Sequence, residues 1–325
     1  MIEQSHWHPV TQSSAVSGQP VGITLLGQAV VVWRDQQGVI HAWADQCPHR
    51  GARFSLGRVT GDTLECAYHG WQFNSQGRCV HVPALPSFKP PDTHCARVFQ
   101  AQEAYGLVWV LLGGQSSPLP LFAAEGDPQL RKINCGPYDV ATSAPRVVEN
   151  FLDMSHFGFV HEGWLGSRDQ TTVQDYDVNP TQTGLLATGC KAWQPQSNVH
   201  SQIAALVEYR YEVTGPFTAV LTKVPDAGSV AIAGFRESIG LFICPLEPET
   251  SRVWFRLAVA DFESTHDTLQ AFQHTIFMQD KPVLESQTPK RLPLQSGAEC
   301  HSAADKASAV YRRHLRQLGL TFGVC

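Results

Sequence analysis

The chain has 325 residues, of which 43% are hydrophobic, and its formal net charge is -5. This length is enough for two compact domains, and the weak negative charge with scattered Lys and Arg argues against a nucleic-acid partner. The N-terminal residues lack the basic start and apolar stretch of a secretory signal, and the longest apolar run, 107–112, is far too short to span a bilayer. We therefore expect a cytoplasmic protein that does not associate with membranes.

Short strands are predicted from about residue 22 to residue 112. Residues 29–33 and 39–43 flank a turn at 35–38, which is a hairpin pattern, and 71–73 and 79–82 repeat it around a turn at 74–77. A further apolar strand follows at 105–112. The Pro-rich segment 117–120 then predicts the exit of a small all-β domain, which we place at residues 1–118.

The second domain, residues 119–325, is predicted to be built on one large antiparallel sheet. Its strand-like runs are separated by turn residues and lie at 201–211, 217–224, 229–233, 240–244 and 252–261. Two segments are predicted to be helical, 147–160 and about 268–286. The expected fold class is therefore α+β. Phe217, Phe235 and Phe242 could line a cavity of the sheet, although core packing is the more common role of such residues.

Two loops of the first domain carry a metal-binding pattern. Each supplies one cysteine and one histidine, Cys47 with His49 and Cys66 with His69. Two thiolates on one iron and two imidazoles on the other is the ligand set of a Rieske [2Fe-2S] cluster. A zinc site is the main alternative, but it usually closes with C-x-x-C and H-x3-5-H spacing.

The sequence around these loops resembles the Rieske domain of Rieske non-heme iron oxygenases. The pattern C-x-H-R-G occurs at residues 47–51, and C-x-Y-H-G-W occurs at residues 66–71. The resemblance extends over almost the whole chain. It is similar to the short single-component branch that includes dicamba and vanillate O-demethylases, and residues 156–166 and 311–325 look closer still to the Rieske hydroxylases of saxitoxin biosynthesis.

A second motif follows in the second domain. Asn150, Asp153 and His156 are three residues apart and are predicted to share a helical face, whereas His161 would point away unless a break at Gly158 or a π-type turn intervenes. By itself such a pattern is more often an amphipathic core helix. Together with a Rieske site upstream, it resembles the mononuclear iron motif of Rieske oxygenases, in which both histidines bind iron.

Two histidines need a carboxylate to complete a facial triad with positions open for dioxygen. Asp280 is the predicted ligand, because it continues an apolar helical stripe toward the core, where an unpaired carboxylate is costly. A similar helix carries the iron-binding aspartate of the short Rieske oxygenases. Weaker alternatives are Glu285, Asp261 and Glu263.

The resemblance implies the terminal component of an oxygenase system, with a [2Fe-2S] cluster, mononuclear Fe(II), and dioxygen as co-substrate. The expected reaction is monooxygenation or oxidative demethylation of a small organic molecule, and cis-dihydroxylation is the enzymatic alternative. A pure electron carrier or a ligand-binding module would be the non-enzymatic alternatives. Since no dinucleotide fingerprint is present, NAD(P)H electrons should arrive through a separate flavin reductase or ferredoxin. In the family, the aspartate that matches Asp153 links a cluster histidine of one subunit to an iron histidine of the next, which implies a homotrimer.

Overall fold

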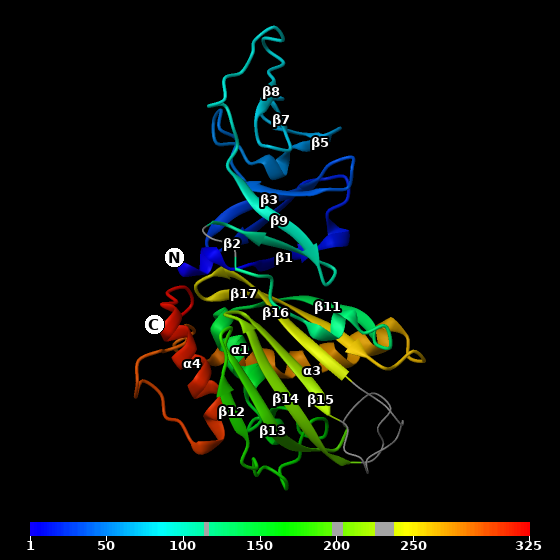
Figure 1. The fold of residues 1–325 in the computed structure, drawn as a ribbon, viewed down its shortest axis with the longest axis vertical. Coiled ribbons are helices and arrows are strands. Elements are labelled where there is room, and N and C mark those ends of the chain that lie inside the picture. Colours follow the sequence, from blue (N-terminus) through cyan, green and yellow to red (C-terminus); the bar gives the residue numbers. More distant parts are fainter. Residues whose placement is uncertain (114–116, 197–203, 225–236) are drawn as a thin grey trace. The chain divides into compact units, whose positions relative to one another are not determined.

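The computed structural model describes residues 1–113, 117–196, 204–224 and 237–325. Contacts within the chain define two units (Figure 1): one is Gln4–Pro118, and the other is Leu119–Cys325 together with Met1–Glu3. The first three residues group with the second unit because the buried Glu3 carboxylate accepts backbone hydrogen bonds from Thr321 and, at 2.7 Å, from Phe322.

The unit Gln4–Pro118 contains two antiparallel sheets. The larger has the strand order β1-β10-β9-β4-β3-β2, and the smaller has the order β5-β6-β7-β8. The strands are β1 His8–Gln12, β2 Val21–Leu25, β3 Gln28–Arg34, β4 Ile40–Ala44, β5 Arg58–Thr60, β6 Thr63–Glu65, β7 Gln72–Asn74, β8 Cys79–His81, β9 Val98–Ala104 and β10 Leu107–Leu111. Both hairpins predicted from the sequence are present, as β3–β4 and β7–β8.

The unit Leu119–Cys325 is built on one seven-stranded antiparallel sheet with the order β11-β17-β16-β15-β14-β13-β12. Its strands are β11 Arg131–Val140, β12 Asp177–Pro180, β13 Leu185–Gln194, β14 Ala205–Gly215, β15 Thr218–Val224, β16 Glu237–Glu247 and β17 Thr250–Val259. Its helices are α1 Ala144–Leu152, α2 Phe157–Val160, α3 His266–Ser286 and α4 Lys306–Leu318.

Helices α1, α3 and α4 pack with the sheet around one apolar core (Figure 1). Val148 of α1, Phe277 of α3 and Leu315 of α4 are all buried in it, together with alternate residues of the strands. Burial of this shared apolar surface is what holds helices to a sheet. The α+β class expected from the sequence is confirmed. Within the described residues, no helix is both long enough and apolar enough to cross a membrane.

The predicted helix 147–160 is wrong in one respect, because α1 ends at Leu152 and a separate short helix, α2, begins at Phe157. Asp153 has an extended backbone, with φ -87° and ψ 135°, and its Oδ1 accepts the backbone N–H of Ser155 at 2.8 Å. This local hydrogen bond competes with helical continuation. The predicted strand 229–233, Phe235 and the first three residues of the predicted strand 201–211 lie outside the described residues.

Candidate functional site

The two cluster loops have the same backbone construction. Cys47 N–H donates to Ala52 and Cys66 N–H donates to Trp71, so each loop closes five residues after its cysteine. Each loop also has a glycine that donates back to the cysteine carbonyl and adopts a left-handed conformation, with φ +73° in the first loop and +70° in the second. A side chain would be strained at either position. The two loops therefore share the same turn conformation around their cysteines.

Across the two loops, cysteine lies next to cysteine and histidine lies next to histidine. The Cys47 and Cys66 thiols are buried and lie next to each other, and the His49 and His69 rings meet edge to face with centroids 4.5 Å apart. Trp71 stacks on His49 at 4.3 Å and fixes the plane of that imidazole. Burial, with the neighbouring Cys66, raises the pKa of the Cys47 thiol to about 12. A bound metal cation reverses this, because it deprotonates a coordinating thiol outright.

Two observations show that these residues fit a [2Fe-2S] cluster. His49 Nδ1 is buried and has no hydrogen-bond partner among the described residues, as expected for a nitrogen reserved for a metal. The cysteines and histidines also do not converge on one point. Within the part of the chain that the structure describes, only His156, His161 and Asp280 bring three potential ligand atoms within 4.8 Å of one another. A single zinc ion needs such convergence, whereas two bridged irons do not.

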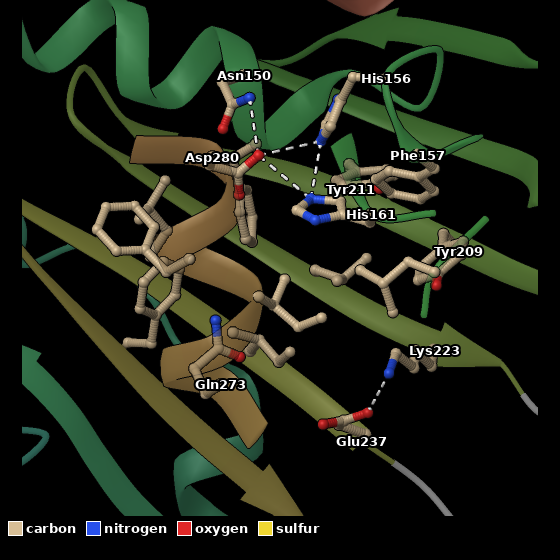
Figure 2. Close-up of a pocket in the computed structure, with 18 of the residues that line it drawn as sticks. Asn150, His156, Phe157, His161, Tyr209, Tyr211, Lys223, Glu237, Gln273 and Asp280 are labelled. Carbon is tan, nitrogen blue, oxygen red and sulfur yellow. Dashed lines mark hydrogen bonds and ion pairs between the residues drawn. The ribbon is translucent and has the colours of Figure 1, made fainter. Parts of the chain in front are cut away.

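His156, His161 and Asp280 form the second candidate metal site (Figure 2). The two histidines stand at opposite ends of the short helix α2, and their Nε2 atoms are 3.2 Å apart. Asp280 Oδ1, from α3, is 3.4 Å from Nε2 of His156 and 3.2 Å from Nε2 of His161. Two imidazoles and one carboxylate on one face are the donor set of a mononuclear non-heme iron site.

The sequence predicted that a break at Gly158 or a π-type turn would bring the histidines together, and this is not what happens. Gly158 lies within α2, and the break lies at Asp153 instead. The role of Gly158 is close packing, because a Cβ there would be 2.8 Å from the carbonyl oxygen of Ser167. Restarting the helix after Asp153 places one helical turn between the two imidazoles.

Each of the two imidazoles is held by a hydrogen bond at its other nitrogen. His156 Nδ1 donates to Asp153 Oδ2 at 3.0 Å, and His161 Nδ1 donates to Gln279 Oε1 at 2.8 Å. These bonds leave both Nε2 atoms for a metal, which is how outer partners usually orient histidine ligands. Gln279 was missed by the sequence analysis, and its only signal was its position next to Asp280. Asn150 Nδ2 donates to Asp280 Oδ1 at 3.3 Å and orients the carboxylate.

The charges of the site are coupled. Burial alone would raise the pKa of Asp280, but hydrogen bonds from His156 and His161 hold it down at about 2. Burial likewise opposes protonation of His156, yet its hydrogen bonds to Asp153 and Asp280 raise its pKa to about 9. A metal ion would replace that proton, since histidine ligands bind in the neutral form.

The residues of this site line part of a pocket within the second unit. Its walls are mainly aromatic and aliphatic side chains, and its polar residues outside the metal site are few. Besides Asn150, His156, His161 and Asp280, it is lined by Val147, Phe151, Phe157, Leu165, Tyr209, Tyr211, Leu221, Lys223, Glu237, Ile239, Leu241, Phe255, Phe272, Gln273, Ile276 and Phe277. Such a lining suits a small, largely apolar molecule.

The structure places the alternative carboxylates away from the triad. Glu285 Oε1 accepts the backbone N–H of Ala141 at 2.9 Å, and Asp261 Oδ1 accepts those of Glu263 and Ser264. Phe217 and Phe242, for which core packing was the favoured expectation over a place in the cavity, are buried and do not line the pocket.

Comparisons with known proteins agree with this geometry. The model of the Rieske [2Fe-2S] domain matches residues 6–99, and that of the vanillate O-demethylase oxygenase C-terminal domain matches residues 140–321. Methylxanthine N1-demethylase NdmA of Pseudomonas putida is 32% identical, over 96% of this chain and 88% of its own. Methylxanthine N3-demethylase NdmB of the same species is 30% identical, over 97% and 89%. A solved structure of NdmA with caffeine superposes with a TM-score of 0.84 at 29% identity, over 97% of this chain and 90% of that one.

A Rieske cluster domain followed by a sheet domain with a two-histidine, one-carboxylate site defines an iron-dependent oxygenase, and its demethylase relatives indicate the monooxygenase type. This chain belongs to the Rieske non-heme iron oxygenases, as its sequence resemblance implied. Its cofactors are the [2Fe-2S] cluster and mononuclear iron, and dioxygen is its co-substrate.

Proposed function

We propose that this oxygenase removes a methyl group from a ring nitrogen of a small planar heterocycle. One observation carries the proposal: the His156, His161 and Asp280 ligand atoms converge at a pocket with aromatic and aliphatic walls. Curated relatives similar to the chain over most of its length are demethylases of methylated xanthines, which supports the same reaction type here.

The proposed reaction consumes one dioxygen, two electrons and two protons for each methyl group. One oxygen atom enters a C–H bond of the N-methyl carbon, and the other leaves as water. The resulting N–CH2OH group then breaks its C–N bond, which gives the N–H product and formaldehyde. When bound, an Fe(II) ion held by His156, His161 and Asp280 would supply the activation of dioxygen.

The residues of the chain have separate tasks in this proposal. The apolar lining, including Phe151, Phe255 and Phe277, excludes water and holds a flat ring. Asp153 and Gln279 orient the two imidazoles, and Asn150 orients the carboxylate. Cys47, His49, Cys66 and His69 hold the cluster that stores electrons. We also place the boundary between the cluster domain and the catalytic domain at residues 118 and 119.

Electron delivery is proposed to involve partners. A separate flavin reductase or ferredoxin reduces the cluster with electrons from NAD(P)H, in the cytoplasm, where that reductant is made. Asp153 is proposed to join the iron site of one subunit to the cluster of its neighbour in a homotrimer. The Asp153 side chain is 27% exposed, so a group from a second chain can reach its carboxylate.

Turnover with labelled dioxygen tests the proposed reaction. The iron-loaded protein, a surrogate reductase and NADH are incubated with N-methyl heterocycles, and formaldehyde, NADH consumption and the 18O content of the product are measured. We expect about one formaldehyde per NADH and no labelled oxygen in the demethylated heterocycle, because the labelled atom leaves with the formaldehyde. Two labelled atoms added to a ring carbon pair would instead identify the cis-dihydroxylation alternative, and oxidation of the cluster without any product would identify an electron carrier.

A further inference from the structure

A polar row crosses the wall of the pocket at one level of the sheet. Tyr209 of β14 pairs with Lys223 of β15, and Lys223 pairs with Glu237 of β16, so the three residues lie directly opposite one another. All three line the pocket. Lys223 Nζ and Glu237 Oε2 form an ion pair at 2.6 Å, with only 9% and 10% of the two side chains exposed.

The neighbouring levels of the same wall are different. Side chains alternate between the two faces of a strand, so the next residues on this face are two positions further along. They are Tyr211, Leu221 and Ile239, which pair across the same three strands, and beyond them Leu241 pairs with Phe255. These residues also line the pocket. The ion pair therefore stands on a wall that is otherwise largely apolar.

The ion pair lies at the end of the pocket away from the metal site (Figure 2). Asp280 marks one end of the pocket on α3, and Gln273, on the same helix, lies near the other end with Lys223 and Glu237. Seven residues of α-helix correspond to two turns, or roughly 10 Å. A compact ring system whose methyl group lies at the metal site would reach the ion pair with its opposite edge.

A buried ion pair between two neighbouring strands costs free energy. Two apolar side chains of similar volume often stabilise a protein as well or better, because both charges must leave water. The cost of the pair is easier to understand if its polar atoms contact a ligand. We propose that the Lys223–Glu237 ion pair is a specificity element that recognises the substrate edge opposite the reacting methyl group. This inference rests on the proposed demethylation and names its substrate class.

The chemistry of the pair defines the edge that it recognises. An ammonium group only donates hydrogen bonds and a carboxylate only accepts them. A ring carbonyl beside a ring N–H offers an acceptor to Lys223 and a donor to Glu237, side by side, as the two charged atoms are. The pair has no net charge, so an uncharged lactam, imide or cyclic urea edge is favoured over a free carboxylate or amine. The inferred substrate is thus an N-methyl heterocycle that carries a carbonyl next to a ring N–H.

Equilibrium binding tests this inference without relying on turnover. The iron-loaded protein is titrated anaerobically, by calorimetry, with two matched pairs of probes: theobromine and caffeine, and 1-methylthymine and 1,3-dimethylthymine. In each pair the second compound has a methyl group in place of the ring N–H. We expect the N–H compound of at least one pair to bind about tenfold more tightly or better, because a site built for a hydrogen bond rejects the analogue that lacks it.

The double variant Lys223→Met/Glu237→Leu should bind both compounds of that pair equally. Asp139→Asn/Arg252→Gln is the matched control, since Asp139 and Arg252 form a 2.6 Å cross-strand ion pair of the same sheet that does not line the pocket. This control should keep the wild-type preference. If the first variant does not fold, as judged by circular dichroism and iron content, Lys223→Leu/Glu237→Met distributes a similar volume differently and makes the same test.

The inference is overturned if the wild-type protein binds neither compound of either pair, or binds both compounds of each pair with similar affinity. It is also overturned if the preference survives in the folded double variant. A preference that disappears in the double variant, in a protein that releases no formaldehyde from any probe, would support the recognition role and contradict only the proposed reaction.

Discussion

Asp153 and His156 are joined by a 3.0 Å hydrogen bond across the gap between α1 and α2, in which the carboxylate accepts the Nδ1 proton of the imidazole. The same carboxylate accepts the Ser155 N–H, so the residue that ends α1 also fixes the first histidine of the metal site. Burial raises the pKa of Asp153, but the hydrogen bond and charge of His156 outweigh it and keep the pKa below its usual value. Asp153 is therefore a charged positioning residue.

Asp153→Asn should leave both metal sites assembled while turnover falls by about 10–100-fold or more. The amide keeps the size of the side chain but removes the charge that supports the His156 N–H. The measurement is single turnover of pre-reduced protein, in which cluster reoxidation is followed with substrate and dioxygen present. Asp177→Asn, at an exposed position of β12, is the control and should reoxidise normally. Normal reoxidation in Asp153→Asn would contradict the role in electron transfer and remove the main argument for a trimer.

Gln279→Leu should weaken iron binding at the mononuclear site by about tenfold, because His161 Nδ1 loses the Gln279 oxygen that orients it and the ring is buried. Gln279→Glu keeps an acceptor oxygen and should restore binding. Iron affinity is measured by competition with a chelator, with the cluster spectrum as the internal control. Equal affinities in the wild type and both variants would show that Gln279 does not position His161.

Cys47→Ser and His69→Ala should each abolish the visible absorption of the [2Fe-2S] cluster, because each removes one of four protein ligands. Cys95→Ser is the matched control, since Cys95 is an exposed free cysteine of the same unit. Its spectrum should be unchanged. A full cluster spectrum in Cys47→Ser or in His69→Ala would refute the assignment of that residue.

Glu299→Gln should change the acid stability of the second unit. Burial raises the pKa of Glu299, but hydrogen bonds from Arg146 at 2.6 Å and Arg312 at 2.5 Å lower it to about 2, from an ordinary value of 4.5. A depressed pKa stabilises the fold above about pH 4.5, and this contribution is lost as the pH falls toward 2. The variant should be less stable by about 1–2 kcal/mol at pH 7, and its thermal midpoint should fall less between pH 5 and pH 3.

Thermal unfolding followed by circular dichroism at pH 7, 5 and 3 measures this difference. Glu162→Gln is the control, because the Glu162–Arg168 pair is well exposed and should contribute little. Parallel pH profiles for the wild type and Glu299→Gln would contradict the assigned role.

The cluster loops could be predicted from the sequence because every ligand lies within a few residues of the turn that positions it. Cys47 and His49 share one loop, and the left-handed glycine that closes it is visible as Gly51. Asp280 was also predictable, since a carboxylate on an apolar helical stripe needs a partner. The first inference depends on local spacing, and the second also used the resemblance to the short Rieske oxygenases.

Other features depend on tertiary contacts and could not be predicted. The end of α1 at Asp153 follows from a side-chain hydrogen bond to Ser155 rather than from a helix-breaking residue. The contact of Gln279 with His161 joins two segments 118 residues apart. Likewise, the Lys223–Glu237 pair becomes visible only when the register of β15 and β16 is known.

We propose above all that this chain holds a mononuclear iron on His156, His161 and Asp280 in addition to its cluster. The most direct test is the iron content per chain after anaerobic reconstitution, for the wild type and for Asp280→Ala, with the cluster spectrum recorded on the same samples. Glu285→Gln serves as control, because that carboxylate lies outside the triad. We predict about three irons in the wild type and the control, and about two in Asp280→Ala with an unchanged cluster spectrum. Two irons in every sample, or three in Asp280→Ala, would contradict the claim.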